Sequence, residues 1–414
     1  MLDYLIVGAG ITGVSVARLL QQHQQGNFLI LEAESEPGGL CRTKQIGQHH
    51  LDIGGGHFLC TKYQEVYDFI FAHIPESEFN FFPRVSKIEV ENEVIDYPIE
   101  ANLWQLPLEK QADYLISALA SGEINQKQEP ENYSDWIRWK LGEQIANSYM
   151  LPYNKKIWGV DPQEMDIDWL HKIPRLNPKE ILLSCLQQRS NTEKFPSHAG
   201  FFYPKAGGFQ TIFDAIYKKI AAQTVLAQPV IKLEQTPQGW LVNDRYEART
   251  VINTAPWNHL YKALGSPSAL EPAFSKLRAN SIVVSLWEQD YQHDWHWNYV
   301  PDLAVRHHRE FYIHNFAPHS QANGIYTETN YLRWQAQVGA TRFTGQPLYE
   351  HINQVAYPIP TLGHATAIQT ILDFYREKNL LGVGRWGQWQ YFNSDVCIWE
   401  AMKFVKQLLN LSQP

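Results

Sequence analysis

The stretch that decides the fold is Gly8-Ala9-Gly10-Ile11-Thr12-Gly13, which follows the apolar run Leu2–Val7 directly. Apolar residues then recur at helical spacing over Ile11–Leu20, so the glycines lie between a predicted strand and a predicted helix. In this context the first glycine allows a tight turn, the second lets a pyrophosphate approach the backbone, and the third lets the helix pack closely on the strand. The pattern predicts a dinucleotide-binding turn made by Gly8, Gly10, Ile11, Thr12 and Gly13.

The second predicted strand, Phe28–Leu31, ends at Glu32 with Ala33 beside it. A carboxylate at this position is placed to accept hydrogen bonds from the ribose of a dinucleotide. Because no arginine is adjacent, a ribose 2′-phosphate is disfavoured. Glu32 and Ala33 are therefore predicted to contact the cofactor.

Two further glycine turns favour FAD over NAD. They are Gly38-Gly39-Leu40-Cys41-Arg42 and Gly54-Gly55-Gly56-His57. A simple dehydrogenase needs neither turn, whereas a flavoprotein of the amine-oxidase type uses such turns to pass its backbone under the flavin ring and the ribityl chain. We predict that the His57 side chain lies against the flavin face, and that the remaining contacts come from Gly39, Leu40, Arg42, Gly55 and Gly56.

A second glycine-containing segment lies near the other end of the chain: Gly384-Arg385-Trp386-Gly387-Gln388-Trp389-Gln390-Tyr391-Phe392-Asn393-Ser394-Asp395. Together with the N-terminal turn it predicts that both ends of the chain hold one FAD and that the middle supplies the substrate site. The predicted cofactor contacts in this segment are Gly384, Arg385, Tyr391, Asn393, Ser394 and Asp395.

Composition excludes several other classes of protein. The net charge of −8 gives no general attraction to nucleic acid or to an anionic membrane. The four cysteines are scattered without a CxxC or Cys/His cluster, which predicts neither a metal site nor a disulfide framework and favours a reducing, cytoplasmic location. No signal peptide is expected, and no apolar stretch approaches the roughly 18–20 residues that span a bilayer. The 14 Trp and 21 Tyr suit stacking against sugars or bases, although most are expected in the core.

The patterning predicts an α/β fold in which two regions are inserted into a Rossmann-type FAD-binding domain. The FAD-binding domain comprises 1–76, 200–256 and 355–414; a helical domain comprises 105–199; an antiparallel-sheet substrate domain comprises 77–104 and 257–354. Helices are expected at 62–74, 108–120, 134–149, 178–188 and 210–221, with Pro152 ending the third helical stretch. Strands are expected within 85–99, 230–234, 239–242, 250–253, 282–287 and 311–316.

Several middle segments resemble one family in the same order along the chain. They are Asp96-Tyr97-Pro98-Ile99-Glu100-Ala101-Asn102, Met150-Leu151-Pro152-Tyr153-Asn154-Lys155-Lys156-Ile157-Trp158-Gly159, Tyr203-Pro204-Lys205-Ala206-Gly207-Gly208, and Arg309 through Pro318. With Tyr357-Pro358, the histidine turn and the C-terminal segment, they are similar to UDP-galactopyranose mutases. The eukaryotic-type branch of that family, which lies within the FAD-dependent amine-oxidase and protoporphyrinogen-oxidase superfamily, is the most similar.

The resemblance implies an isomerase that feeds cell-surface glycan synthesis. In this family the N5 atom of reduced FAD attacks the anomeric carbon of a nucleotide sugar, and the sugar interconverts between pyranose and furanose forms without net redox change. It also implies a nucleotide-sugar or other small-molecule substrate and a reductant for the flavin, and it leaves a homo-oligomer open.

Residue roles are carried over position by position. His57, Arg309 and Arg385 match the residues nearest the reacting centre, the two arginines as partners of the diphosphate. A guanidinium forks onto phosphate, which a lysine does less well. The positions that match substrate contacts are Tyr97, Asn102, Tyr153, Asn154, Trp158, Trp297, Tyr299, Tyr357 and Tyr391.

The chain departs from the family at two places. No arginine stands in register for the second diphosphate contact after Trp169-Leu170, where Lys172 or Arg175 is the nearest cation. Glu100 stands where the family offers a glutamine. The alternative function is an FAD-dependent oxidoreductase of the amine-oxidase or protoporphyrinogen-oxidase type, because fold alone does not choose between the two chemistries. The histidines of 301–330, among them His307, His308, His314 and His319, are interpreted as surface or strand residues.

Overall fold

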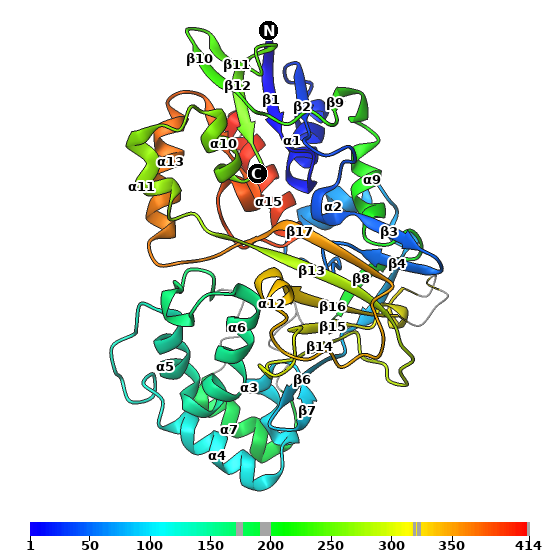
Figure 1. The fold of residues 1–414 in the computed structure, drawn as a ribbon, viewed down its shortest axis with the longest axis vertical. Helices are drawn as coiled ribbons and strands as arrows, with labels where there is room; N and C mark the ends of the chain where they lie inside the picture. The colour runs from blue at the N-terminus through cyan, green and yellow to red at the C-terminus, as the bar shows by residue number, and fades with distance from the viewer. Residues whose placement is uncertain (171–176, 191–199, 318–319, 321–323, 412–414) are drawn as a thin grey trace.

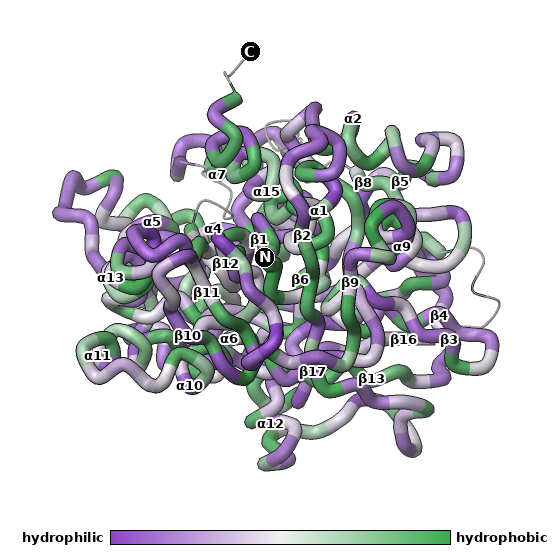
Figure 2. The backbone as a smooth tube through the Cα atoms, turned by 90° about the horizontal axis from the view of Figure 1, so that it is seen from above, coloured by the Kyte–Doolittle hydropathy of each residue, from purple (hydrophilic) through white to green (hydrophobic). Residues whose placement is uncertain are grey.

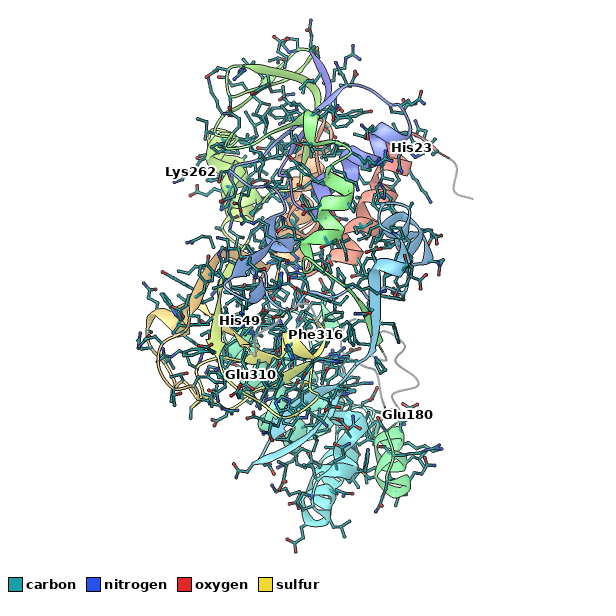
Figure 3. All side chains as sticks on the ribbon, turned by 90° about the vertical axis from the view of Figure 1, so that its right-hand side faces the viewer. His23, His49, Glu180, Lys262, Glu310 and Phe316 are labelled. Carbon is teal, nitrogen blue, oxygen red and sulfur yellow. The ribbon has the colours of Figure 1, made fainter. Side chains whose placement is uncertain are left out.

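A computed structural model describes residues 1–170, 177–190, 200–317, 320 and 324–411. The molecule has three parts stacked along its long axis, and the middle part is a second sheet (Figure 1). The N-terminal strand and the C-terminal helix both lie in the upper part (Figure 1). The labelled side chains follow the same order: His23 and Lys262 lie in the upper part, His49, Glu310 and Phe316 in the middle, and Glu180 at the bottom (Figure 3).

The upper part is built on a sheet with the strand order β10-β11-β12-β1-β2-β9, to which β18 adds beside β12. Its strands are β1 (Leu2–Val7), β2 (Phe28–Leu31), β9 (Thr224–Val225), β10 (Leu233–Thr236), β11 (Gly239–Val242), β12 (Tyr246–Asn253) and β18 (Leu380–Gly382). The central pair β1 and β12 is parallel, with Leu5 opposite Val251. The last residues of both strands, 5–7 and 251–253, are buried, as expected where helices cover both faces of a parallel pair. The predicted Rossmann-like α/β fold is confirmed.

Helices from both ends of the chain pack on this sheet. α1 (Ile11–Gln22) packs against α15 (Ser394–Leu408), so the first and last helices of the chain are neighbours. The remaining helices of the upper part are α2 (Gln64–Phe71), α9 (Gln210–Tyr217), α10 (Trp257–Ala263), α11 (Glu271–Phe274), α13 (His364–Arg376) and α14 (Gly384–Gly387). Hydrophobic colouring runs through central elements such as β1 and α1, and hydrophilic colouring gathers at the periphery (Figure 2).

The middle part is a second sheet with the strand order β17-β13-β16-β15-β14-β6-β7. Its strands are β6 (Ser86–Val90), β7 (Glu93–Asp96), β13 (Ala279–Glu288), β14 (Trp297–Tyr299), β15 (Arg309–Phe311), β16 (Gly324–Asn330) and β17 (Tyr349–Pro358). All neighbouring pairs are antiparallel except β14 and β6, which run parallel. The sheet is therefore mixed at the place where the segment 77–104 joins it.

The lower part is helical. It contains α3 (Ile99–Asn102), α4 (Leu108–Leu119), α5 (Tyr133–Ile145), a π-helical turn (Ala146–Met150), α6 (Leu151–Trp158) and α7 (Pro178–Gln187). α12 (Tyr331–Gln335) follows β16 in the middle part. Two small sheets, β3 (Thr43–Ile46) with β4 (His49–Asp52) and β5 (Phe79–Pro83) with β8 (Gly200–Pro204), connect the parts. None of the helices in the described ranges combines the length and the apolar character that a membrane span requires.

Pro152 does not end the helical stretch, so this prediction was wrong. The residue occupies the first turn of α6, where its missing N–H breaks no intrahelical hydrogen bond. The chain runs from α5 through the π-helical turn into α6 and ends at Gly159, which adopts φ 69° as a left-handed cap.

The strand expected at 311–316 was also wrong, since β15 ends at Phe311 and a short 3-10 helix covers Ile313–Asn315. The Asn315 amide donates to the carbonyls of His293 (2.9 Å) and Trp295 (2.7 Å), which turns the chain out of the sheet. The apolar run predicted a strand because the sequence does not show the tertiary contact of Asn315 that ends it.

The three predicted segments stay a proposed division of the chain. One boundary cuts through an element, since residue 354 lies inside β17. Another separates paired strands, since β5, which follows the limit at 76, pairs with β8 of the proposed FAD-binding domain. α10 and α11, which follow residue 256, share a buried cluster with β12 and α13.

Candidate active site

The N-terminal turn leaves room above Gly10. A Cβ atom at Gly13 would lie 2.1 Å from the Gly8 carbonyl oxygen, so this glycine lets α1 lie close to β1. A Cβ atom at Gly10 would meet no other atom within 4 Å. The first turn of α1 carries no acidic residue, so its free N–H groups suit an anion such as a pyrophosphate.

The C-terminal segment touches this turn directly. Gly384, at φ 76°, lies so close to Thr12 that a Cβ atom would be 2.3 Å from the Thr12 Oγ1. Thr12 also hydrogen-bonds to Cys397 in the first turns of α15. The N-terminal turns of α1 and α15 therefore lie side by side, and Asn393, Ser394 and Asp395 begin the second of them.

Glu32 and the second glycine turn lie beside Gly10. The two Glu32 carboxylate oxygens accept the N–H groups of Ala9 (2.6 Å) and Glu34 (2.9 Å), which fixes the carboxylate at the end of β2. The Gly38 N–H donates to the Ala9 carbonyl at 2.9 Å, and Arg42 donates to the Gly39 carbonyl at 3.0 Å. Ala33 is exposed next to Glu32. The Leu40 carbonyl lies against Gly54, so the second glycine turn contacts the turn that carries His57.

The His57 turn is packed tightly on the second sheet. Gly55, at φ 91°, lies against the Glu328 carboxylate, and Gly56 lies against the Phe311 ring. The His57 Nδ1 is 3.2 Å from the Gly55 carbonyl oxygen. Burial, helped by the positive charge of Arg385, lowers the pKa of His57 to about 4. The imidazole is therefore neutral at physiological pH.

Replacing His57 with alanine should change the absorption spectrum of bound flavin, because the predicted contact of the imidazole with the ring would be lost. Turnover of the unaltered protein should show no titration from His57 between about pH 5.5 and pH 8, since its pKa lies below this range. Spectra of the two proteins at equal FAD content check the first point. An unchanged spectrum together with an unchanged rate would leave His57 without a role at the flavin.

One cavity brings together residues from all three parts of the molecule. Its lining includes Tyr97, Tyr153, Asn154, Trp158, Tyr299, Tyr391 and Arg309 of the predicted site, together with Pro98, Glu100, Tyr149, Met150, Ile157 and Trp169. The Tyr97 and Tyr299 rings are 5.1 Å apart, and Trp158 meets Tyr391 edge-on at 5.1 Å. Burial raises the pKa of the buried lining phenols Tyr97, Tyr149, Tyr153 and Tyr391, so they stay protonated and serve as hydrogen-bond donors.

Arg309 is the one cation in the described lining of the cavity. Its guanidinium donates twice to the Glu328 Oε2, with the Nε at 3.0 Å. The His308 Nε2 lies 3.4 Å from the same oxygen. Burial alone would raise the pKa of Glu328, but Arg309 and His308 lower it to about 2. Its other oxygen, Oε1, is buried without a hydrogen-bond partner against Gly55, so Glu328 connects Arg309 to the His57 turn.

Arg385 lies behind the cavity wall rather than on it. Its Nε donates to the Phe392 carbonyl (2.7 Å) and its Nη1 to the Ala356 carbonyl (3.1 Å), so it joins the C-terminal segment to β17. The guanidinium carbon is 5.6 Å from the centre of the Tyr357 ring, and Tyr357 meets Tyr391 edge-on at 5.1 Å. Tyr357 thus connects Arg385 with the lining residue Tyr391.

Three predicted substrate residues are engaged within the protein. The Asn154 amide donates to the Tyr133 hydroxyl (2.7 Å) and accepts from the Trp158 indole (3.0 Å). Asn102 is buried off the cavity wall and donates to the Pro98 carbonyl. Trp297 is buried under the wall and donates to the Tyr299 hydroxyl (3.0 Å).

Two charged residues at the site, Arg84 and Glu328, were not predicted from the sequence, and Glu100 was noted only as a departure from the family. The Arg84 guanidinium carbon lies 4.7 Å from the centre of the Tyr97 ring and 4.6 Å from that of Trp297, and its Nη2 donates to the Tyr299 hydroxyl. The pairing of β15 with β16 brings Glu328 opposite Arg309. The sequence offered one sign that Arg84 lies near the site: it immediately precedes the alternating strand predicted within 85–99.

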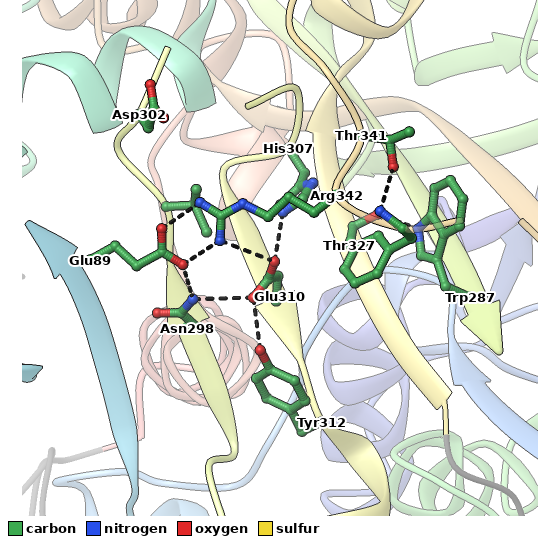
Figure 4. Close-up of polar contacts among 12 residues, drawn as sticks. Glu89, Trp287, Asn298, Asp302, His307, Glu310, Tyr312, Thr327, Thr341 and Arg342 are labelled. Atoms are coloured by element: carbon green, nitrogen blue, oxygen red, sulfur yellow. Dashed lines mark hydrogen bonds and ion pairs between the residues drawn. The ribbon is translucent and has the colours of Figure 1, made fainter. Parts of the chain in front are cut away.

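The interpretation of His307 and His308 as surface or strand residues was wrong, because both are buried and lie just before β15. His307 donates to Glu310 at 2.8 Å. Glu310 also accepts from Tyr312 and Asn298, while Arg342 pairs with Glu89 beside it (Figure 4). Arg309 and Glu310 point to opposite faces of β15. Ion pairs therefore hold this strand on both faces.

Lys172, Arg175 and His319 lie outside the described residues. Within the described part of the chain, no group of three or more metal-ligating side chains is found, and the cysteines form no disulfide.

Comparison with known proteins confirms the resemblance. Residues 6–72 match the family model described as NAD(P)-binding Rossmann-like domain. The dTDP-fucopyranose mutase of Escherichia coli is 22% identical, covering 96% of both chains. The probable UDP-galactopyranose mutase of Klebsiella pneumoniae is also 22% identical, covering 99% of this chain and 95% of the relative. Both relatives are bacterial, so they do not single out the eukaryotic-type branch.

The fold is that of a solved mutase. The crystal structure of reduced UDP-galactopyranose mutase superposes with a TM-score of 0.88 at 20% identity, covering 100% of this chain and 97% of the other. The Rossmann-like match, the relatives and this fold imply an FAD cofactor. The open space above Gly10 and the two adjacent helix N-termini fit the pyrophosphate of that cofactor.

Proposed function

We propose that the protein is an FAD-dependent mutase that interconverts the pyranose and furanose forms of a nucleoside-diphosphate hexose without net redox change. The observation that carries the proposal is the cavity in which Arg309 and several protonated tyrosines meet beside the His57 turn. Among the described residues of its lining there is no Ser, Cys or His, so these residues offer none of the usual acyl-transfer nucleophiles. Full-length relatives named as mutases support the same chemistry.

The residues of this chain then have separable tasks. Arg309 is oriented by Glu328 to bind a phosphate of the diphosphate through its guanidinium, and Tyr391 is placed to donate to a phosphate oxygen. Tyr97, Tyr299 and Trp158 provide flat surfaces that exclude water from the base and the sugar. Neutral His57 packs at the flavin without adding charge.

FAD would be held by the turns at Gly8–Gly13 and Gly38–Arg42, the His57 turn and the segment from Gly384 to Asp395. When bound and reduced, it would supply the nucleophilic centre that the described residues of the cavity wall do not offer. A cytoplasmic location and a reductant for the flavin are parts of the proposal, and a homo-oligomer is left open.

Anaerobic incubation of the reduced protein with UDP-galactopyranose or dTDP-fucopyranose tests the proposal. We expect a product of the same mass that separates chromatographically as the furanose isomer. An oxidised organic product together with consumption of oxygen would instead favour the oxidoreductase function. The absence of any isomer across both nucleotide sugars, at full FAD content, would contradict the proposal.

A further inference from the structure

Glu100 is the acidic residue in the described lining of the cavity, and no described residue forms an ion pair with it. The residue is fully buried, and neither carboxylate oxygen has a hydrogen-bond partner. Buried polar side chains are nearly always hydrogen-bonded, so an unpartnered carboxyl on a cavity wall indicates a group that a ligand completes.

Among the described residues, no counter-charge lies beside Glu100. The titratable side chains that interact with it are the phenols of Tyr97, of Tyr133 on α5 and of Tyr149 on the π-helical turn. On β7, Asp96 pairs with Lys87, and on α7 the Ser184 hydroxyl donates to the Ala101 carbonyl. Arg309, across the same cavity, is neutralised by Glu328.

Burial therefore controls the charge of Glu100. Loss of solvation raises the pKa of this carboxyl to about 7, and only its own backbone N–H acts to lower it. The three phenols have raised pKa values as well, so they do not titrate near neutrality. Below about pH 7 the group is a neutral acid with one donor and one acceptor on adjacent oxygens.

We propose that Glu100 is a specificity-determining residue: its neutral carboxyl makes a paired donor–acceptor contact with a cyclic C=O/N–H edge of the ligand, such as that of a uracil or thymine ring, and binding retains one proton on the protein. A neutral carboxylic acid and such an edge complement each other, whereas a carboxylate only accepts. An edge that presents two donors, as guanine does, fits the carboxylate instead.

The flat walls agree with a ring-shaped ligand group at this position. Tyr97, Tyr149 and Trp169 line the same cavity as Glu100 and present aromatic surface to it. The inference rests on the proposed function for the idea that the ligand is a nucleotide sugar. It does not depend on the fate of the sugar.

Calorimetric binding of UDP-galactose to the oxidised holoprotein tests this inference without turnover. The diphosphate diester keeps its charge between about pH 6 and pH 8.5, so a change in affinity reports on the protein. Affinity should fall by about tenfold per pH unit above the pKa of Glu100, because binding then requires uptake of a proton. Titrations in buffers of different ionisation enthalpy should show uptake approaching one proton per ligand at about pH 8.5.

The matched variant is Glu100→Gln, which keeps the size and the donor–acceptor pair but does not titrate. Its affinity should be the same at both pH values and close to that of the unaltered protein at about pH 6. Glu100→Leu, which removes the hydrogen bonds, should bind about tenfold or more weakly at every pH. GDP-mannose, with its guanine edge, should not share the loss of affinity with rising pH.

A pH-independent affinity of the unaltered protein, or the same pH slope in Glu100→Gln, would overturn the inference. A difference infrared spectrum between these two proteins at about pH 6 gives an independent readout, since it should show the carbonyl band of one protonated carboxyl. If the pH-linked binding is found but no isomer forms, the proposed function fails while the role of Glu100 stands. If isomerisation occurs but binding does not depend on pH, the proposed function stands while the role of Glu100 fails.

Discussion

Arg309→Met should lower the free energy of unfolding by about 3–5 kcal/mol near pH 7, the range found when one partner of a buried ion pair is removed. The reason is that Glu328 is fully buried and would keep its charge without the guanidinium that now compensates it. Chemical denaturation at equal FAD content measures the change. Turnover should fall as well, because Arg309 is the one cation in the described lining of the cavity.

The same variant has a defined pH dependence. The pKa of Glu328 is lowered to about 2 in the folded protein, below its unfolded value of roughly 4.3, so the pair stabilises the fold above about pH 4.3 and this contribution is lost as the pH falls toward 2. Without Arg309 the carboxyl should protonate more easily. The destabilisation should therefore shrink between about pH 7 and pH 5.

The double variant Arg309→Met/Glu328→Gln is the control. It removes both charges, so it should recover most of the stability that Arg309→Met loses. Equal destabilisation of the single and the double variants would mean that the ion pair does not hold this part of the second sheet.

Arg385→Ala should lower turnover by about 10²-fold, the loss that a misplacement of about 1 Å caused by a mutation far from the reacting atoms can produce, and should leave the FAD content unchanged. Arg385 connects β17 to the C-terminal segment through two carbonyls and lies beside Tyr357, which packs on the lining residue Tyr391. Turnover and flavin released per protein should be measured on the same preparation.

Arg385→Lys is the matched variant, since it keeps the charge but loses the planar fork. We expect it to recover only part of the activity. Normal kinetics in Arg385→Ala would contradict a role of Arg385 in positioning Tyr357 and Tyr391. A parallel loss of FAD and turnover would mean that Arg385 acts by holding the cofactor-binding C-terminal segment in place.

The cofactor-binding turns were predictable because each of them is specified by a short local sequence motif. Gly8, Gly10 and Gly13 follow one strand and begin one helix, so their spacing fixes the turn before any tertiary contact forms. The two glycine segments together indicated a single cofactor held by both ends of the chain, but the contact of Gly384 with Thr12 was not predicted.

The parts that were missed depend on pairing between distant strands. Glu328 faces Arg309 because β15 and β16 are neighbours, and no local pattern specifies this register. Glu100 was noted as a departure from the family, but its burial could not be predicted. The burial of its carboxyl without a hydrogen-bond partner results from the packing of α3 against α5 and α7. The burial of His307 likewise depends on Glu310, a partner that its spacing did not reveal.

The dependence of turnover on the oxidation state of the flavin tests the central claim most directly. UDP-galactopyranose is added under nitrogen to the protein with its FAD either reduced by dithionite or left oxidised, and the flavin spectrum is followed while the nucleotide sugar is analysed. We predict isomer formation over many turnovers with the reduced protein, a flavin that stays reduced throughout, and no reaction with the oxidised protein. Reduction of the oxidised flavin by an organic substrate, with no isomer from either form, would contradict the account.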